Sequence, residues 1–177
     1  HNPSYFSNCG NNCPVEQVSW NDIQNFVDKL ISRNNKVYRL PTEAEWEYVC
    51  RGGGKDDKYS GTSSDSELRN YAWYKYAWYY KFFPNKRTHP VGEKTPNLLG
   101  IHDMSGNVWE WVSDHYLKVY YNDSPRNNPK GPSLTPSHVI RGGSWDVASR
   151  YLRCSFRGHN APDFGERSIG FRLVMDK

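Results

Sequence analysis

Helical periodicity is confined to the first fifty residues of this chain, and everything that follows is short and interrupted. Apolar side chains recur at helical spacing between Trp20 and Ile31. Thr42 and Glu45 then form a capping box for a second helix. Beyond Arg51, strand-like pieces are separated by long stretches rich in Gly, Pro, Asn and Ser. This order predicts an α+β fold with two short helices, small antiparallel sheets and extensive loops.

Three segments predict strands: 108–112, 139–145 and 169–174. A shorter extended piece, 37–40, stands just before the second helix. Only 36% of the residues are hydrophobic, yet 15% are aromatic, so the core must take its volume from a few large rings. We expect this core to include Trp109, Trp111 and Trp145.

The length of 177 residues predicts one domain, spanning 1–177. The net charge of +4 is spread without a run of five basic residues, so no nucleic-acid partner is expected. No stretch approaches the roughly 18 apolar residues that a membrane span requires. We therefore expect no membrane span in this chain. We also expect the protein to be a monomer.

The four cysteines differ in context. Cys9 and Cys13 lie in a Gly- and Asn-rich loop without a second Cys or His pair at zinc spacing, which argues against a structural zinc. In an exported protein they could form a loop disulfide; the alternative is two free thiols. Cys50 and Cys154 are expected to be small buried residues.

An aromatic repeat follows the second helix: the tetrapeptide 71–74, Tyr-Ala-Trp-Tyr, recurs at 76–79. A five-residue offset fits no solenoid. The repeat is either a local duplication in an aromatic loop or an exposed aromatic platform for a ligand.

Five motifs, in this order and spacing, resemble the formylglycine-generating-enzyme (sulfatase-modifying-factor) family. They are Pro14-Val15-Glu16-Gln17-Val18-Ser19-Trp20, Arg39-Leu40-Pro41-Thr42-Glu43-Ala44-Glu45-Trp46, Gly106-Asn107-Val108-Trp109-Glu110-Trp111, Arg141-Gly142-Gly143-Ser144-Trp145 and Gly170-Phe171-Arg172. The resemblance covers nearly the whole chain and implies a C-type-lectin-like fold. The strand or two that usually open the family's domain are expected to be missing ahead of Asn2.

The resemblance fails at the family's catalytic chemistry. The enzymes carry a copper-binding cysteine three residues after the Ser of Gly-Gly-Ser, and a second one five residues later. Those places correspond here to Val147 and, at or near the second, Leu152. Because soft Cu(I) requires thiolates, we expect no copper and no oxidase activity.

The resemblance also implies a Ca²⁺ site formed by the side chains of Asp103 and Glu110 and by the carbonyls of Gly106 and Val108. Carboxylate and backbone oxygens suit this hard cation. The alternative is that both carboxylates accept backbone hydrogen bonds instead. A related branch of the scaffold binds non-haem iron through histidines, for which His89, His102 and His115 would be the candidates, although no His motif supports it.

Residues 146–168, the C-terminal stretch, resemble the variable region of diversity-generating-retroelement proteins of the Treponema variable protein A kind. Randomising the first two bases of an Asn codon cannot produce Glu, Lys, Gln, Met or Trp. These types make up 29 of the 154 residues outside the stretch, so about four are expected in its 23 residues; it has one, Glu166. An ordinary family loop that drifted by chance is the alternative.

These observations predict a non-catalytic receptor- or adhesin-type domain with a variable face that binds an unknown protein or surface ligand. The alternative is an enzyme of the same scaffold, oxidase or iron-dependent. We expect export to the cell surface, with a lipid anchor on the missing N-terminal segment as one route. Arg150, Arg153, Arg157 and Arg167 should tie the stretch to the scaffold. The side chains expected on one solvent-facing surface are Asp146, Val147, Ser149, Tyr151, Leu152, Ser155, Phe156, His159, Phe164, Gly165 and Ser168.

Overall fold

Both predicted helices are present in the structure, a computed structural model that describes residues 2–34, 36–76 and 86–176. Helix α1 spans Trp20–Asn34 and α2 spans Glu43–Cys50. The capping box of α2 is complete, with the Thr42 side chain accepting from the Glu45 N–H. Ser19 and Asp22 form the same reciprocal pair at α1: the Asp22 N–H donates to Ser19 Oγ, and the Ser19 N–H donates to the Asp22 carboxylate. The shorter Asp therefore completes the box as Glu would.

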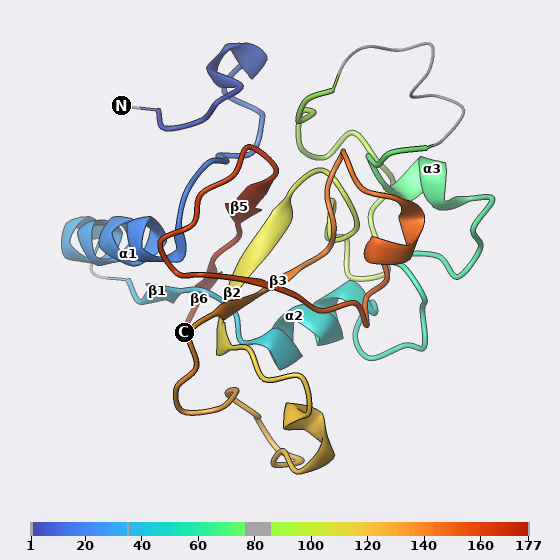
Figure 1. Ribbon diagram of the computed structural model, residues 1–177. Coiled ribbons are helices and arrows are strands. Elements are labelled where there is room, and N and C mark those ends of the chain that lie inside the picture. The colour runs from blue at the N-terminus through green and yellow to red at the C-terminus, as the bar shows by residue number, and fades with distance from the viewer. Residues whose placement is uncertain (1, 35, 77–85, 177) are drawn as a thin grey trace.

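The main sheet has four strands in the order β4-β3-β2-β5 and lies at the centre of the molecule (Figure 1). These are β2 (Trp109–His115), β3 (His138–Arg141), β4 (Gly158–Asn160) and β5 (Ile169–Phe171). The expectation of purely antiparallel sheets is wrong in one place, because β5 pairs with β2 in parallel. Residues 161–168 carry the chain from β4, at one edge of the sheet, to β5 at the other edge, where it runs beside β2 in the same direction.

The second sheet is small and joins distant parts of the chain. Strand β1 (Tyr38–Arg39) pairs antiparallel with β6 (Val174–Met175). The predicted strand 169–174 is therefore divided between two sheets. The remaining elements are single turns: η1 (Ser7–Cys9), α3 (Leu68–Tyr71), η2 (Tyr120–Asn122) and η3 (Ser149–Tyr151).

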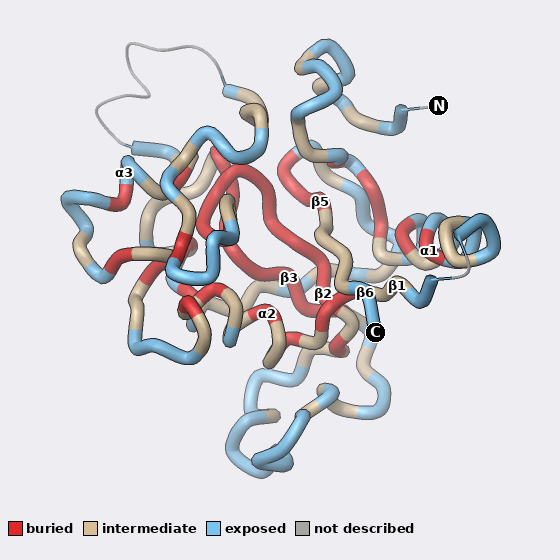
Figure 2. The backbone as a smooth tube through the Cα atoms, turned by 180° about the vertical axis from the view of Figure 1, so that it is seen from behind, coloured by how far each residue is buried: buried red, intermediate tan, exposed pale blue. Residues whose placement is uncertain are grey.

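The core is concentrated along β2 and β3, whereas α1 exposes its outer side and the segment from 117 to 137 is mostly exposed (Figure 2). Trp109, Trp111 and Trp145 are all buried, as predicted. Trp46 of α2 is also buried, but in a second hydrophobic cluster that includes the disulfide-bonded Cys50 and Cys154. In the described part of the chain no helix is long and apolar enough to cross a membrane.

Candidate ligand-binding face

The C-terminal stretch is attached to the scaffold mainly through its own main chain. Its carbonyls at Val147, Pro162 and Ser168 accept backbone N–H groups from Lys75, Asn21 and Trp109, at 2.9, 3.1 and 2.8 Å. The carbonyl of Leu152 accepts from the Ser105 hydroxyl at 2.9 Å. These bonds satisfy main-chain groups of the stretch and fix its path independently of most of its side chains.

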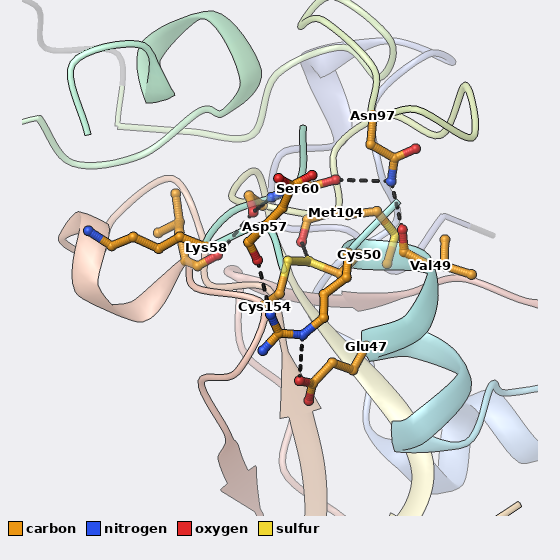
Figure 3. The surroundings of a disulfide bond; sticks show 12 residues. Glu47, Val49, Cys50, Asp57, Lys58, Ser60, Asn97, Met104 and Cys154 are labelled. Atoms are coloured by element: carbon orange, nitrogen blue, oxygen red, sulfur yellow. Dashed lines mark hydrogen bonds and ion pairs between the residues drawn. A yellow bond between two sulfur atoms is a disulfide. The ribbon is translucent and has the colours of Figure 1, made fainter. Parts of the chain in front are cut away.

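A second set of anchors holds the middle of the stretch. The guanidinium of Arg141, which has no exposed surface, donates to the carbonyls of Cys154 and Phe156 and to the Glu47 carboxylate. Cys154 is also disulfide-bonded to Cys50 at the end of α2 (Figure 3). The prediction for these two cysteines is therefore corrected: both are buried, but as a covalent cross-link. Of the two alternatives for Cys9 and Cys13, the loop disulfide is the one present.

The Arg-Gly-Gly-Ser turn is shaped to receive this stretch. Gly143 has a φ of 73°, and a Cβ there would lie 2.8 Å from Leu152 Cδ1 and 3.0 Å from the Tyr151 carbonyl oxygen. Only glycine fits such a close approach in this backbone conformation. The turn and the stretch thus pack directly against each other.

Nine of the eleven predicted face residues are exposed or half-buried, and two are not. Leu152 is fully buried with Tyr59 and Leu68 in a hydrophobic cluster, and the buried Ser168 lies beside the start of β2, with its carbonyl accepting the Trp109 N–H. These two predictions are wrong. Without a strand or helix period in the stretch, inward and outward positions could not be told apart from the sequence.

Three of the predicted residues meet on one aromatic cluster. Val147, Tyr151 and Phe156 pack against the core cluster that contains Trp109. The Phe156 ring lies edge-on to Tyr151, with centroids 5.0 Å apart, and 5.8 Å from the Trp109 ring. Half-buried rings on a buried tryptophan are the kind of anchor that dominates binding hot spots.

The N-terminal arm borders the same stretch, a neighbour that the sequence did not indicate. The Phe6 ring lies edge-on to Trp145, with centroids 5.8 Å apart, and the Arg167 guanidinium lies over the rings of Tyr5 and Trp145. The buried Glu16 carboxylate fixes this arm by accepting the N–H groups of Tyr5 and Phe6, at 3.1 and 2.8 Å. Burial raises the pKa of Glu16 above its ordinary value.

Other predicted residues lie apart from this cluster. His159, on β4, stacks on Tyr116, with ring centroids 4.0 Å apart. Gly165 approaches the backbone of Gln17 just before α1, and its neighbour Phe164 is exposed. Asp146 is held by the Ser144 hydroxyl at 2.6 Å. Of the remaining predicted positions, Ser149 is half-buried and Ser155 is exposed.

Among the described residues, only one of the four named arginines ties the stretch to the scaffold through hydrogen bonds of its side chain. Arg157 binds the buried Glu43 carboxylate through two nitrogens, at 2.7 and 2.8 Å. Within the described part of the chain, Arg167 pairs with its neighbour Glu166 and touches the scaffold through the rings of Tyr5 and Trp145. The side chains of Arg150 and Arg153 donate hydrogen bonds to residues of η3. The prediction is wrong for these three.

The main scaffold anchor is instead Arg141, outside the stretch. In the sequence, only its place in the Arg-Gly-Gly-Ser motif marked Arg141 as a residue of interest. That motif did not reveal the function of the side chain, because the partners of Arg141 lie on α2 and beyond β3.

The two positions that resemble the enzymes' copper ligands are apolar and packed. Leu152 belongs to the cluster of Tyr59 and Leu68, and Val147 packs against that cluster. All four cysteines of the chain are consumed by the two disulfides. In this state the protein presents no thiolate for Cu(I).

Three of the four predicted calcium ligands, Asp103, Val108 and Glu110, line a cavity of about 450 Å³, whereas Gly106 packs against the backbone of Trp73. Asp103 fits the role: its Oδ2 accepts the Gly92 N–H at 2.8 Å, while its buried Oδ1 has no hydrogen-bond partner. Burial raises the pKa of this carboxyl group. Glu110 fits less well, because both its oxygens bind Arg172, at 2.6 and 2.7 Å, and one also accepts from Trp46 Nε1. Calcium binding here remains a prediction, with Asp103 as its main ligand.

The histidines named for iron do not come together. His89 stacks on Trp73, whereas His115 packs on His138. His102 donates through Nδ1 to the Lys94 carbonyl at 2.7 Å. Across residues 2–34, 36–76 and 86–176, no three His, Cys, Asp or Glu side chains are grouped to hold a metal ion.

Of the aromatic repeat, the first copy and Tyr76 are described, while 77–79 lie outside the described residues. Trp73 is enclosed by the His89 ring, 3.8 Å away between centroids, and by the Lys94 ammonium, 3.8 Å from the ring centroid. Tyr74 packs against the cluster around Leu152. The first copy therefore supports the stretch from beneath rather than forming an open platform.

Comparison with known proteins identifies relatives of two kinds. The family model described as sulfatase-modifying factor enzyme 1-like domain matches residues 3–177. The formylglycine-generating enzyme of Streptomyces coelicolor is 36% identical over 177 aligned residues, which cover 93% of this chain and 53% of that enzyme. Among solved structures, Treponema denticola variable protein 1 has a TM-score of 0.87 and 32% identity, covering 98% of this chain and 77% of that one. PvdO from Pseudomonas aeruginosa has a TM-score of 0.77 and 28% identity, covering 95% and 64%.

The chain spans about half the length of the curated enzyme it matches. The structural comparisons agree with the C-type-lectin-like α+β fold expected from the motifs.

Proposed function

Because the chain belongs to the sulfatase-modifying factor enzyme 1-like family, we propose that it uses this family's scaffold as a non-catalytic ligand-binding domain whose C-terminal stretch carries a variable face. The observation that carries the proposal is the way in which the stretch is held. Its carbonyls, its disulfide and the buried Arg141 secure it, and most of its side chains do not. Side chains there can change while the backbone stays in place, as binding loops on a rigid scaffold require.

The chemistry at Val147 and Leu152 supports a binding role over an oxidase role. A packed pair of aliphatic side chains stands where the resembled enzymes carry thiols, and the chain's own cysteines are cross-linked elsewhere. The likeness to a variable protein points in the same direction. The relatives that are named as formylglycine-generating enzymes make an oxidase of the same scaffold the second candidate.

Two disulfides support export, since such bonds persist in oxidising compartments. We propose display at the cell surface, where a variable face would meet protein or surface ligands.

Metal content separates the binding role from the enzymatic one. The protein purified without reductant should contain less than about 0.1 equivalent of copper or iron by mass spectrometry, because it presents no thiolates for Cu(I). Stoichiometric copper or iron, together with oxidation of a Cys-containing sulfatase peptide, would establish the enzyme instead.

Variation of the face can be tested by substitution. A library randomised at Ser149, Ser155 and Phe164 should remain folded in most members, because surface changes usually alter stability by no more than about 0.5 kcal/mol. A matched library at the buried Leu152, Tyr59 and Leu68 should fail to fold in most members, since losses of core volume cost roughly 2–5 kcal/mol. Sequencing the gene's surroundings for a reverse transcriptase and a near-copy of the 3′ end would test the source of the variation.

A further inference from the structure

Two guanidinium groups on the C-terminal stretch have no acidic partner. Arg150 and Arg153 are both exposed, and neither is paired with a carboxylate within the described part of the chain. The carboxylates of adjoining segments are engaged elsewhere: Asp65 by Lys58 and Tyr59, and Asp146 by Ser144. Positive charge is therefore left uncompensated at this place.

Both guanidinium groups are nevertheless held in position. Arg150 lies over the Tyr151 ring, 4.5 Å from its centroid, and its Nη2 donates to the Tyr151 hydroxyl at 2.9 Å. Arg153 donates through Nε to the Arg150 carbonyl at 3.1 Å, which leaves its two terminal nitrogens for another acceptor. Side chains that are ordered in advance lose less entropy when a ligand binds.

Apolar surface adjoins these charges. Phe156 donates its N–H to the Arg153 carbonyl at 2.9 Å, and its half-buried ring lies against Tyr151. Arg150, Tyr151, Arg153 and Phe156 thus form one basic-aromatic patch, anchored on Trp109 beneath.

We infer that the basic-aromatic patch binds an acidic segment of a partner protein, an inference that rests on the proposed binding role of this stretch. Guanidinium forks match carboxylates in shape and charge, and each such charge-assisted hydrogen bond is stronger than a neutral one. Tyr151 and Phe156 offer packing for apolar side chains next to those carboxylates, which a purely anionic polysaccharide would not use. The two arginines would select acidic partners as a class, and the side chains around them would distinguish one partner from another.

The test is selection of a peptide-display library on the whole immobilised protein, followed by affinity measurement for the recovered peptides. We expect Asp and Glu to be enriched in the selected peptides. The double variant R150S/R153S should bind them at least about tenfold more weakly, given the strength of charge-assisted bonds. The double variant R126S/K130S removes the same charge from exposed positions on another loop, and it should bind them within about twofold of the unaltered protein.

Peptides without acidic enrichment, or an equal loss in both double variants, would overturn the inference. Displacement by dextran sulfate at concentrations matching those of the peptides would overturn it too, since binding would then need charge alone. The proposed function has a separate readout: peptides whose binding survives both R150S/R153S and Y151S/F156S would show that this part of the stretch is not the binding face. Neutral peptides that require Tyr151 and Phe156 would retain the proposed function and reject only the acidic partner.

Discussion

Cys154, in the middle of the C-terminal stretch, is disulfide-bonded to Cys50, the last residue of α2, across 104 positions of sequence. The bond connects the stretch to the helix whose other end is capped by Thr42. A side chain within the C-terminal stretch therefore serves the scaffold.

Removing this disulfide should destabilise the protein strongly. Because the bond closes a long loop, C50A/C154A should lower the free energy of unfolding by about 2–5 kcal/mol, measured by urea denaturation. The variant C9A/C13A opens a loop of only four positions and should lose less. An equal or larger loss for C9A/C13A would contradict this account.

Arg141 should be far more important for stability than the exposed arginines. Replacing it in R141M leaves Glu47 Oε2 and two carbonyls of the stretch without the Arg141 donor, while Glu47 Oε1 still accepts from Arg51. We expect a loss of roughly 3–5 kcal/mol, as for breaking other buried ion pairs. The control R153S should change stability by no more than about 0.5 kcal/mol. Comparable unfolding curves for the two variants would show that Arg141 is not the anchor.

Stability should fall in mild acid because of His138. Burial, with His115 nearby, lowers the pKa of His138 to about 4 from its ordinary 6.5. Protonation therefore favours the unfolded chain: the contribution of His138 is complete above pH 6.5 and is lost as the pH falls towards 4.

In H138F, the drop in melting temperature between pH 7 and pH 4 should be smaller than in the unaltered protein. A residual drop is expected because burial also lowers the pKa of His89 to about 4. The exposed H159F is the control, and its pH profile should match that of the unaltered protein. An unchanged profile in H138F would reject this role of His138.

Calcium binding can be decided by thermal unfolding with and without chelator. If the ion binds at Asp103, adding excess Ca²⁺ to the chelator-treated protein should raise its melting temperature. At a free Ca²⁺ concentration one hundred times the dissociation constant, the free energy of unfolding should rise by about 2.7 kcal/mol. The variant D103N should abolish the rise, whereas D176N, in an exposed ion pair with Arg39, should retain it. No rise in the unaltered protein would leave Asp103 as a buried carboxyl without a metal.

The helix starts, the aromatic core and the family could be determined from the sequence alone. Thr42 with Glu45, and Ser19 with Asp22, mark helix starts because a capping box is complete within four residues. Trp109, Trp111 and Trp145 could be assigned to the core because a chain poor in aliphatic residues has few other ways to fill one. The ordered motifs were sufficient for the family, since together they span the chain.

Only the tertiary structure decided which residues serve the face and which support it. Leu152 and Tyr151 are neighbours in an aperiodic turn, yet one is fully buried and the other half-exposed. Arg141 and Arg153 are the same residue type, yet one is enclosed by α2 and the stretch while the other faces solvent. Cys154 forms a disulfide with Cys50, which lies 104 positions away in the sequence. Glu110 forms an ion pair with Arg172, 62 positions away. The physical reason is that burial, cross-linking and ion pairing depend on which distant segments meet, and a sequence without a regular period does not encode those meetings locally.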